Sequence, residues 1–289
     1  MQFAVCLSFT DQRPEVDLLT GAVATDVRSS GLSAADGAAL ELALQVAAVW
    51  GAEVVAVTAG PPEAGVVLRD ALAAGATRAV RVALLTAGSA EQVAAALRPV
   101  VGGATLVWCG DQGLDAGSGA VPAFLAAMLG AEAALGLVDV TVPVSAGSGL
   151  TVLRRLDGGR REQLVVGAPA VLSVEGGVVR LRRASLPAVL RAGPATIEVV
   201  TGAGAAPSAT VRIGLPAPYR PAPRVVPAPA GDRALDRVRA LTGADGTGGG
   251  SGGPTRSAAA RTATPAEAAD AILDALAAWG YELPERAPR

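Results

Sequence analysis

The 289-residue sequence contains no histidine, no lysine and no asparagine, and all 24 of its basic side chains are arginines. Without histidine, the chain has neither an imidazole base nor a histidine metal ligand. Without lysine, it has no amine for a Schiff base and no lysine for a phosphate-binding loop. No paired carboxylates and no nucleophile with a neighbouring base are evident either. These absences count against a free-standing enzyme.

Cysteine is scarce as well, with only Cys6 and Cys109 in the chain. Each lies at or near the end of an apolar run. Two isolated thiols make neither a zinc site nor a disulfide framework, and we expect both to be buried in the core.

Long hydrophobic runs are also missing, although about half of the residues are hydrophobic. The most apolar segment, 116–131, contains Pro122 and several glycines, so it falls short of the roughly 20 apolar residues of a membrane span. The N-terminus lacks a basic region followed by a cleavage site. The net charge of -2 argues against nucleic-acid binding, which calls for a basic surface. We expect a soluble cytoplasmic protein.

Apolar runs and capped helices alternate through the first 130 residues. β-branched runs of this kind are typical of buried parallel strands, and the alternation predicts an α/β fold, a parallel sheet with helices on both faces. Strands are expected at 3–7, 52–58, 78–84 and 104–109, and helices at 33–49, 63–74, from 89 onwards, and at 118–129. The helix at 33–49 should bury one face, made by Leu40, Ala43, Leu44 and Ala47.

The remainder divides into three parts. Short strands at 138–144, 150–156, 163–166 and 170–175, with a hairpin signal at 157–159, should add antiparallel strands and complete an α/β domain over 1–200. Proline and glycine predict an extended arm and linker over 201–262. A C-terminal helix over 263–283, capped by Thr264 with Glu267 three residues later, should pack on a partner subunit or on its own domain.

Three segments could carry function. The glycine-rich 110–119 loop lies between a strand and a helix, where backbone N–H groups hold phosphate, although such turns also occur without a ligand. The 58–62 turn, with its small residues, lets a flat ring or a backbone approach closely, or is an ordinary tight turn. The 180–191 segment, RLRRASLPAVLR, is either a solvated basic loop or a docking loop with an apolar anchor in a charged rim.

Together these segments resemble the beta subunit of electron-transfer flavoproteins. Residues 33–44 look like the family's N-P-F-D-x-x-A-L-E-x-A-L. Residues 60–62 and 68–79 look like G-P-x and L-R-x-A-L-A-M-G-A-D-R-A. Residues 109–115 look like C-G-K-Q-A-I-D, and 168–171 and 184–187 look like L-P-A-V and A-T-L-P. The matches come in the family's order over most of the chain.

The resemblance implies a Rossmann-like adenine-nucleotide-binding domain in a heterodimer. The alpha subunit would hold most of the FAD, and a dehydrogenase would donate the electrons. Leu186, flanked by Ser185 and Pro187, would be the docking anchor for that dehydrogenase. An AMP would lie near these positions: Cys6, Ser33, Ala34, Ala35, Asp36, Ala59, Asp115, Ala116, Gly117, Ser118, Gly119, Ala120 and Val121.

The chain also departs from the family pattern. Ser33, Gly117 and Ala120 replace an asparagine, an acidic residue and a glutamine that an AMP site would use, so we expect AMP to be absent or substoichiometric. Ser8 replaces a lysine, and Arg155 replaces a glutamate placed to steer the mobile flavin domain. The chain is similar to actinobacterial branches associated with the redox peptide cofactor mycofactocin.

Two other classes remain open at this point. A nucleotide-binding sensor of the universal-stress-protein type would share the α/β fold, would form a homodimer with ATP or AMP, and would leave the long C-terminal tail unexplained. A free-standing enzyme is the other.

Overall fold

The computed structural model describes residues 1–84, 89–114, 117–142, 145, 149–201, 233–242 and 264–278. The chain divides into two units, Met1–Tyr219 and Arg220–Arg289. The segment 244–253 and nearly all of 201–231, which the sequence marks as linker and arm, lie outside the described residues. The domain boundaries drawn from composition therefore stay predictions.

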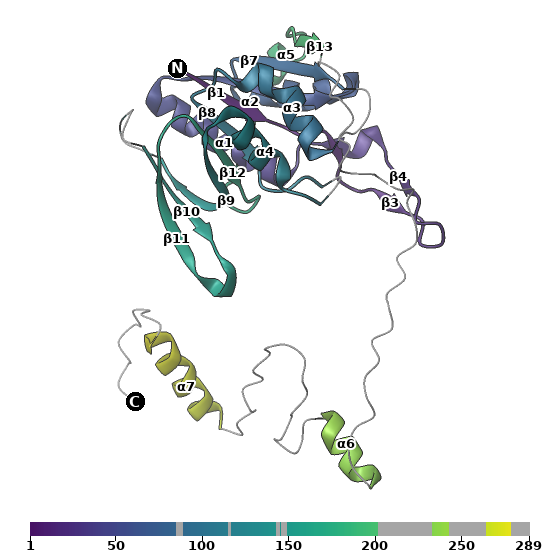
Figure 1. The fold of residues 1–289 in the computed structure, drawn as a ribbon, viewed down its shortest axis with the longest axis vertical. Coiled ribbons are helices and arrows are strands. Elements are labelled where there is room, and N and C mark those ends of the chain that lie inside the picture. The colour runs from purple at the N-terminus through teal and green to yellow at the C-terminus, as the bar shows by residue number, and fades with distance from the viewer. Residues whose placement is uncertain are drawn as a thin grey trace. The chain divides into compact units, whose positions relative to one another are not determined.

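A nine-stranded sheet, in the order β11-β10-β9-β12-β8-β1-β6-β7-β13, forms the centre of the first unit (Figure 1). Its parallel part confirms the α/β prediction. That part comprises β9 (Glu132–Thr141), β12 (Ala170–Val174), β8 (Leu106–Gly110), β1 (Gln2–Cys6), β6 (Glu53–Gly60), β7 (Arg78–Ala83) and β13 (Glu198–Thr201).

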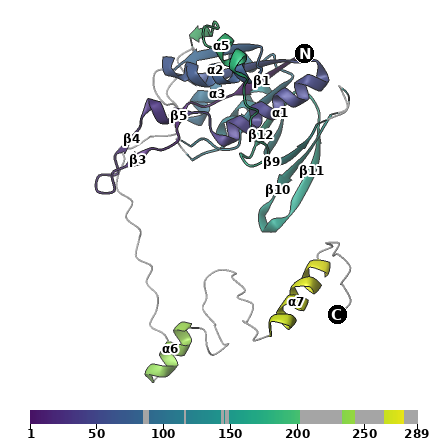
Figure 2. The ribbon, with the colours of Figure 1, turned by 180° about the vertical axis from the view of Figure 1, so that it is seen from behind.

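Helices cover both faces of this sheet, which explains why the central strands are continuously apolar. α1 (Ala34–Trp50) and α2 (Gly65–Ala74) pack on one face with Phe3 and Val5 of β1. α3 (Ala90–Val101) and α4 (Ala120–Leu129) pack on the other face with Ala4 and Cys6. Figure 2, seen from behind, shows α1 lying across the sheet.

α1 differs from its prediction in how much of it is buried. The sequence indicated one apolar face, but Glu41 and Val46 are buried as well. The reason is that residues around Leu181 pack on the outer side of the helix, and Arg182 reaches Glu41. Helix α1 is therefore enclosed between the sheet and a later segment of the chain.

Helix starts follow the capping signals at two places. The Ser33 hydroxyl accepts a hydrogen bond from the Asp36 N–H at 3.0 Å. Ser89 and Gln92 form the predicted capping box of α3, at 3.3 and 2.9 Å.

At two other places the helix start is shifted from its prediction. The 3-10 turn η2 (Pro62–Ala64) precedes α2, so the α-helix starts at Gly65 and not at residue 63. α4 begins at Ala120 with Gly119 as its N-cap, because the Ser118 hydroxyl lies 3.5 Å from the Ala120 nitrogen and does not reach the next turn.

The antiparallel addition is smaller than predicted. β9 pairs with β10 (Leu150–Arg155), which pairs with β11 (Arg161–Val166) across the turn η3 (Asp157–Gly159). The hairpin signal is confirmed, and Gly158 there has a φ of 72°. The expectation that 170–175 joins the antiparallel strands is wrong. β12 runs parallel between β8 and β9, where all five of its residues are buried.

Between β1 and α1 the chain forms a projecting hairpin, residues 10–31, which we call the arm. At its base β2 (Thr10–Asp11) pairs with β5 (Ser30–Gly31), and further out β3 (Glu15–Val16) pairs with β4 (Val23–Ala24). The 3-10 turn η1 (Val27–Ser29) leads back to the base. Figure 1 shows β3 and β4 extending away from the sheet. No sequence motif indicated this arm.

Three further α-helices occur among the described residues. α5 (Leu186–Ala192) forms within the basic 180–191 segment and packs against α2. In the second unit α7 (Pro265–Ala278) starts at the predicted capping box, where Thr264 N–H donates to Glu267 at 2.8 Å. α6 (Ala234–Thr242) lies within the Pro/Gly-rich segment 201–262. No described helix is long and apolar enough to cross a membrane.

Candidate nucleotide site

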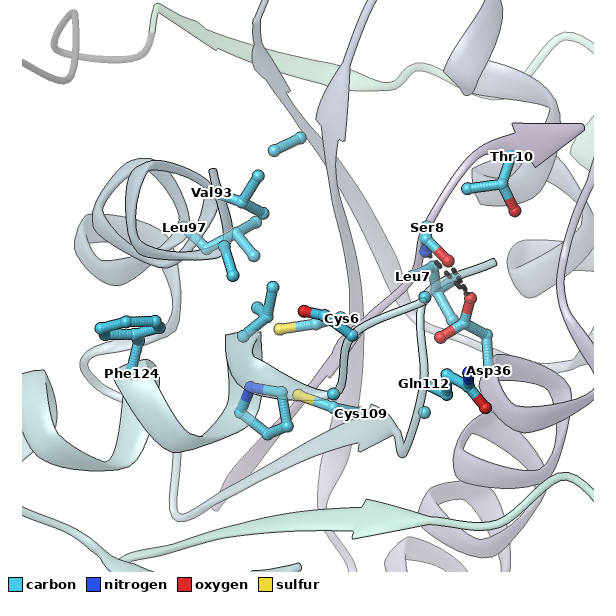
Figure 3. A pocket seen from close by; sticks show the side chains of 18 of the residues that line it. Cys6, Leu7, Ser8, Thr10, Asp36, Val93, Leu97, Cys109, Gln112 and Phe124 are labelled. Atoms are coloured by element: carbon cyan, nitrogen blue, oxygen red, sulfur yellow. Dashed lines mark hydrogen bonds between the residues drawn. The ribbon is translucent and has the colours of Figure 1, made fainter. Parts of the chain in front are cut away.

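A cavity of about 450 Å³ lies at the carboxyl edge of the parallel strands, beyond the ends of β1 and β8. These two strands are neighbours, but β1 leads through α1 to β6 on one side, while β8 leads through α4 towards β9 on the other. Such a reversal of direction is a topological switch point, where open α/β sheets bind their ligands. Figure 3 shows side chains from both strand ends and from the surrounding helices lining this cavity.

The wall of the cavity is mostly apolar, with polar groups at a few positions. It holds two carboxylates, Asp36 and Glu91, and no arginine is among its described residues. The lining consists of Cys6, Leu7, Ser8, Phe9, Thr10, Asp36, Ala59, Ser89, Ala90, Glu91, Val93, Leu97, Cys109, Gly110, Gln112, Gly113, Ser118, Gly119, Val121, Pro122 and Phe124. An apolar cavity with a few convergent polar groups is the usual form of a small-molecule site.

Asp36 is the buried carboxyl group of this wall. Its carboxylate accepts hydrogen bonds from the Ser8 hydroxyl and from the Ser8 N–H, the latter at 3.1 Å (Figure 3). The close approach requires Gly110 at the end of β8, because a Cβ there would lie 2.7 Å from an Asp36 carboxylate oxygen. Burial raises the pKa of Asp36, although its hydrogen bonds from Ser8 and Ser33 oppose the rise.

Asp36→Asn is expected to change how stability depends on pH. Because the folded-state pKa of Asp36 is raised above the ordinary value of 3.8, folding favours the protonated carboxyl. This contribution is fully present below the unfolded pKa and is lost as the pH rises through the folded pKa. In urea unfolding between about pH 4 and 7, wild-type stability should therefore decline relative to that of the non-titrating variant. A difference that stays constant over this range would contradict the raised pKa.

The N-terminus of α4 faces the cavity but offers it few backbone donors. In its first turn the Ala120 N–H donates to the Ser118 hydroxyl at 3.5 Å and Pro122 has no N–H, so Val121 is the residue there whose N–H could donate to a ligand. The preceding loop folds back on itself, since Gly113 N–H donates to the Ser118 carbonyl at 2.9 Å and Gly117 N–H to the Gly113 carbonyl at 2.9 Å. The positive end of a helix dipole still favours an anion such as phosphate, but with fewer N–H donors than a helix start without proline.

Cys6 and Cys109 are register partners on β1 and β8, and both line the cavity. Their prediction as buried thiols is confirmed. The hydrogen bond between the two sulfurs, together with burial, raises the pKa of Cys109. Because the thiolate is the reactive form, the raised pKa counts against Cys109 as a nucleophile.

The structure brings part of the predicted nucleotide positions together. Cys6, Asp36, Ala59, Ser118, Gly119 and Val121 line the cavity. Ser33 caps α1 behind the wall, and Ala34 and Ala35 pack against Gly176 and Gly110. Gly117 and Ala120 lie beside the lining in the α4 loop and first turn, and Asp115 and Ala116 lie outside the described residues. Their role in binding a nucleotide stays a prediction.

Several lining residues were not predicted from the sequence. Ser8 and Thr10 follow β1 at the carboxyl edge of the sheet. Because ligands bind at that edge, their position just after a strand could have predicted them as lining residues. Glu91, Val93 and Leu97 come from α3, which follows the distant strand β7 in sequence. No local signal places α3 beside β1, because its position depends on the strand order.

The predicted docking residues lie on α5 and its cap. Ser185 caps the helix, Pro187 occupies its first turn, and the Leu186 side chain is 71% exposed. The segment before it is held to α1 by Arg182, whose guanidinium donates two hydrogen bonds of 2.9 Å to the buried Glu41 carboxylate. Leu186 is therefore an exposed apolar side chain on an anchored support.

Arg155 lies at the end of β10, where its guanidinium donates to both carboxylate oxygens of Glu175 at 2.9 and 3.2 Å. Glu175 raises the pKa of Asp111 in addition to the effect of burial. Arg155 thus pairs with a carboxylate near the start of the glycine-rich loop, and its side chain remains 63% exposed.

Comparison with known proteins identifies the family. Residues 20–204 match the model of the electron transfer flavoprotein domain. The chain is 30% identical over 189 residues to Protein FixA of Rhizobium meliloti (strain 1021), covering 62% of this chain and 64% of that protein. It is 32% identical over 201 residues to Protein FixA of Sinorhizobium fredii (strain NBRC 101917 / NGR234), covering 62% and 70%. The chain thus spans a little under two thirds of the first of these relatives.

The family match extends over most of the sheet and over most of the cavity wall, apart from the lining residues 6–10. It agrees with the series of family motifs between residue 33 and residue 187. A single glycine-rich loop would not have been enough to identify the family. The resemblance predicted from those motifs is confirmed, and the chain belongs to the electron transfer flavoprotein family, among its beta subunits.

Proposed function

We propose that this chain is the beta subunit of a heterodimeric electron-transfer flavoprotein. It would carry electrons from flavin dehydrogenases to a downstream acceptor through FAD held mainly by an alpha subunit, and would not be a catalyst alone. The observation that carries the proposal is the family match over residues 20–204, which includes most of the cavity wall. FAD, when bound, supplies the redox chemistry. The chain would supply an apolar wall that excludes water and a surface for the donor.

The cavity fits only part of an AMP molecule. Its volume and apolar walls suit a flat ring, and the dipole of α4 favours a phosphate, although Pro122 in the first turn has no N–H to donate. However, Gly117 and Ala120 contribute no polar side chain, and the Asp36 carboxylate is already engaged by Ser8. With no arginine in the described lining, a phosphate would depend on backbone donors. We therefore propose that AMP is absent or substoichiometric.

Co-expression with an alpha-type subunit is expected to yield a yellow heterodimer, while the chain expressed alone should be colourless. Extraction of the pure heterodimer should release FAD, with less than one AMP per dimer. Absorbance spectra and chromatography of the extracted nucleotides measure both. A stable, colourless chain that does not bind the alpha-type subunit would contradict the proposed function. One AMP per dimer would contradict only the proposal for the nucleotide.

The cavity alone would also suit a nucleotide sensor of the universal-stress-protein type, because that class uses the same edge of a similar sheet. Such a sensor would form a homodimer that binds ATP or AMP without any alpha-type subunit, so the same co-expression experiment separates the two. The cytoplasmic location and the actinobacterial, mycofactocin-associated branch stay predictions.

A further inference from the structure

The arm, residues 10–31, carries a cluster of exposed apolar side chains at its outer end. Leu18 and Leu19 are each 87% exposed, which makes them the most exposed of the large apolar residues described. Val16, Val23 and Val27 on the same arm are more than half exposed. Single exposed apolar residues are ordinary, but a cluster at one projecting tip marks an interaction surface.

The tip holds this shape through its own hydrogen bonds. The Asp17 carboxylate accepts from the Leu19 N–H and from the Thr20 hydroxyl, both at 2.8 Å. The Asp17 backbone closes the turn, accepting from Gly21 N–H at 2.7 Å and donating to the Ala22 carbonyl at 2.9 Å. The two leucines therefore stand on a formed turn.

The base of the arm is held in the same way. The Asp11 carboxylate accepts from the Arg13 N–H at 2.8 Å, from the Asp26 N–H at 2.7 Å and from the Ser29 hydroxyl. One side chain thus joins both sides of the hairpin. The polar groups of the arm thus hydrogen-bond to one another, while its leucines contact water. A surface that is already ordered before a partner binds loses less conformational entropy on binding.

The arm starts at the cavity. Ser8, Phe9 and Thr10 line the cavity, and Thr10 is also the first residue of the arm. A molecule bound to the arm would therefore lie at the carboxyl edge of the sheet. β3 and β4 have only two residues each, too short to offer an edge for strand addition. The contact would instead be made by the leucine side chains in an apolar groove.

We propose that the arm docks Leu18 and Leu19 into an apolar groove on the alpha-type subunit. This inference rests on the proposed function, which puts the flavin-bearing subunit against the edge where the arm begins. The predicted anchor for the electron donor, Leu186, lies elsewhere, on α5 against α2, which leaves the arm to the flavin-bearing subunit. A second copy on the same tip would occupy the side from which the flavin-bearing subunit must approach the cavity.

The double substitution Leu18→Asp with Leu19→Asp tests this docking. It is expected to weaken binding of the alpha-type subunit at least about 100-fold, as loss of a central apolar anchor does. The matched control is Val165→Asp on β11, which replaces a side chain that is 72% exposed and should leave binding unchanged. Because these side chains make little contact with the core, both variant chains should melt at the wild-type temperature. Titration of each variant with the alpha-type subunit gives the dissociation constants.

The possible outcomes separate the two proposals. If wild-type chain forms no yellow heterodimer, the proposed function fails. If wild-type chain forms it and the double variant binds equally tightly, the docking role of the arm is overturned while the proposed function stands. Should the isolated chain dimerise through the arm, with the double variant monomeric and its binding of the alpha-type subunit intact, the occupant is a second copy and the inference is again wrong.

Discussion

Gly119→Ala is expected to lower the free energy of unfolding by about 1–3 kcal/mol and to displace the start of α4. A Cβ at this position would lie 2.1 Å from the backbone carbonyl oxygen of Asp111, closer than any real contact. Since the obstacle is backbone, no side-chain rotation can relieve it, and the glycine-rich loop must move away from the helix. Urea unfolding measures the stability, and the FAD content of the heterodimer reports on the cavity wall.

Gly103→Ala is the matched control for this substitution. A Cβ there meets no atom within 4 Å, and its φ lies outside the left-handed region. Alanine should therefore be neutral or should stabilise the fold by about 0.4–1 kcal/mol, by restricting the unfolded chain. Equal stability of the two variants would show that the backbone at residue 111 can shift at little cost in free energy. That loop would then not fix the N-terminus of α4.

Leu186→Ala is expected to slow electron transfer from the dehydrogenase at least about tenfold at low donor concentration, because an exposed anchor leucine contributes to donor binding. The heterodimer and its flavin should be unaffected, since 71% of the side chain is exposed and α5 keeps its Ser185 cap. Rapid-mixing measurements of flavin reduction at several dehydrogenase concentrations give the second-order rate. The flavin-to-protein ratio gives the integrity of the site.

Val165→Ala provides the comparison for Leu186→Ala. Val165 is an equally exposed apolar residue on β11, outside the 180–191 segment, and its truncation should leave the rate of flavin reduction at the wild-type value. Loss of flavin from Leu186→Ala would refute the docking role, because Leu186 would then support the heterodimer. An unchanged rate would refute it as well.

Local features of the fold were predictable from the sequence for a physical reason. The caps of α1, α3 and α7 depend on a hydroxyl and an N–H three residues apart, and the ends of α2 and α4 depend on single glycines. The buried strands followed from β-branched runs. The family was predictable too, because its motifs occur in order along the chain. All of these are properties of neighbouring residues.

Other features depend on which strands lie side by side, and no local pattern contains that information. The sequence pattern placed β12 wrongly among the antiparallel strands. Its position between β8 and β9 depends on the sheet order, which no local pattern contains. The same order brings Cys6 beside Cys109 and gives the cavity its α3 wall. It also buries Asp36 against Ser8, 28 residues away.

The ordered motifs were enough to predict the electron transfer flavoprotein family. Whether the apolar residues of the arm are buried could not be read from their types, because leucine and valine favour the core in any sequence. The fold leaves Leu18 and Leu19 in water because the hairpin projects from the sheet and satisfies its own polar groups. Whether a side chain is exposed depends on the structure around it. The exposed leucines of the arm could therefore be identified only from the tertiary structure.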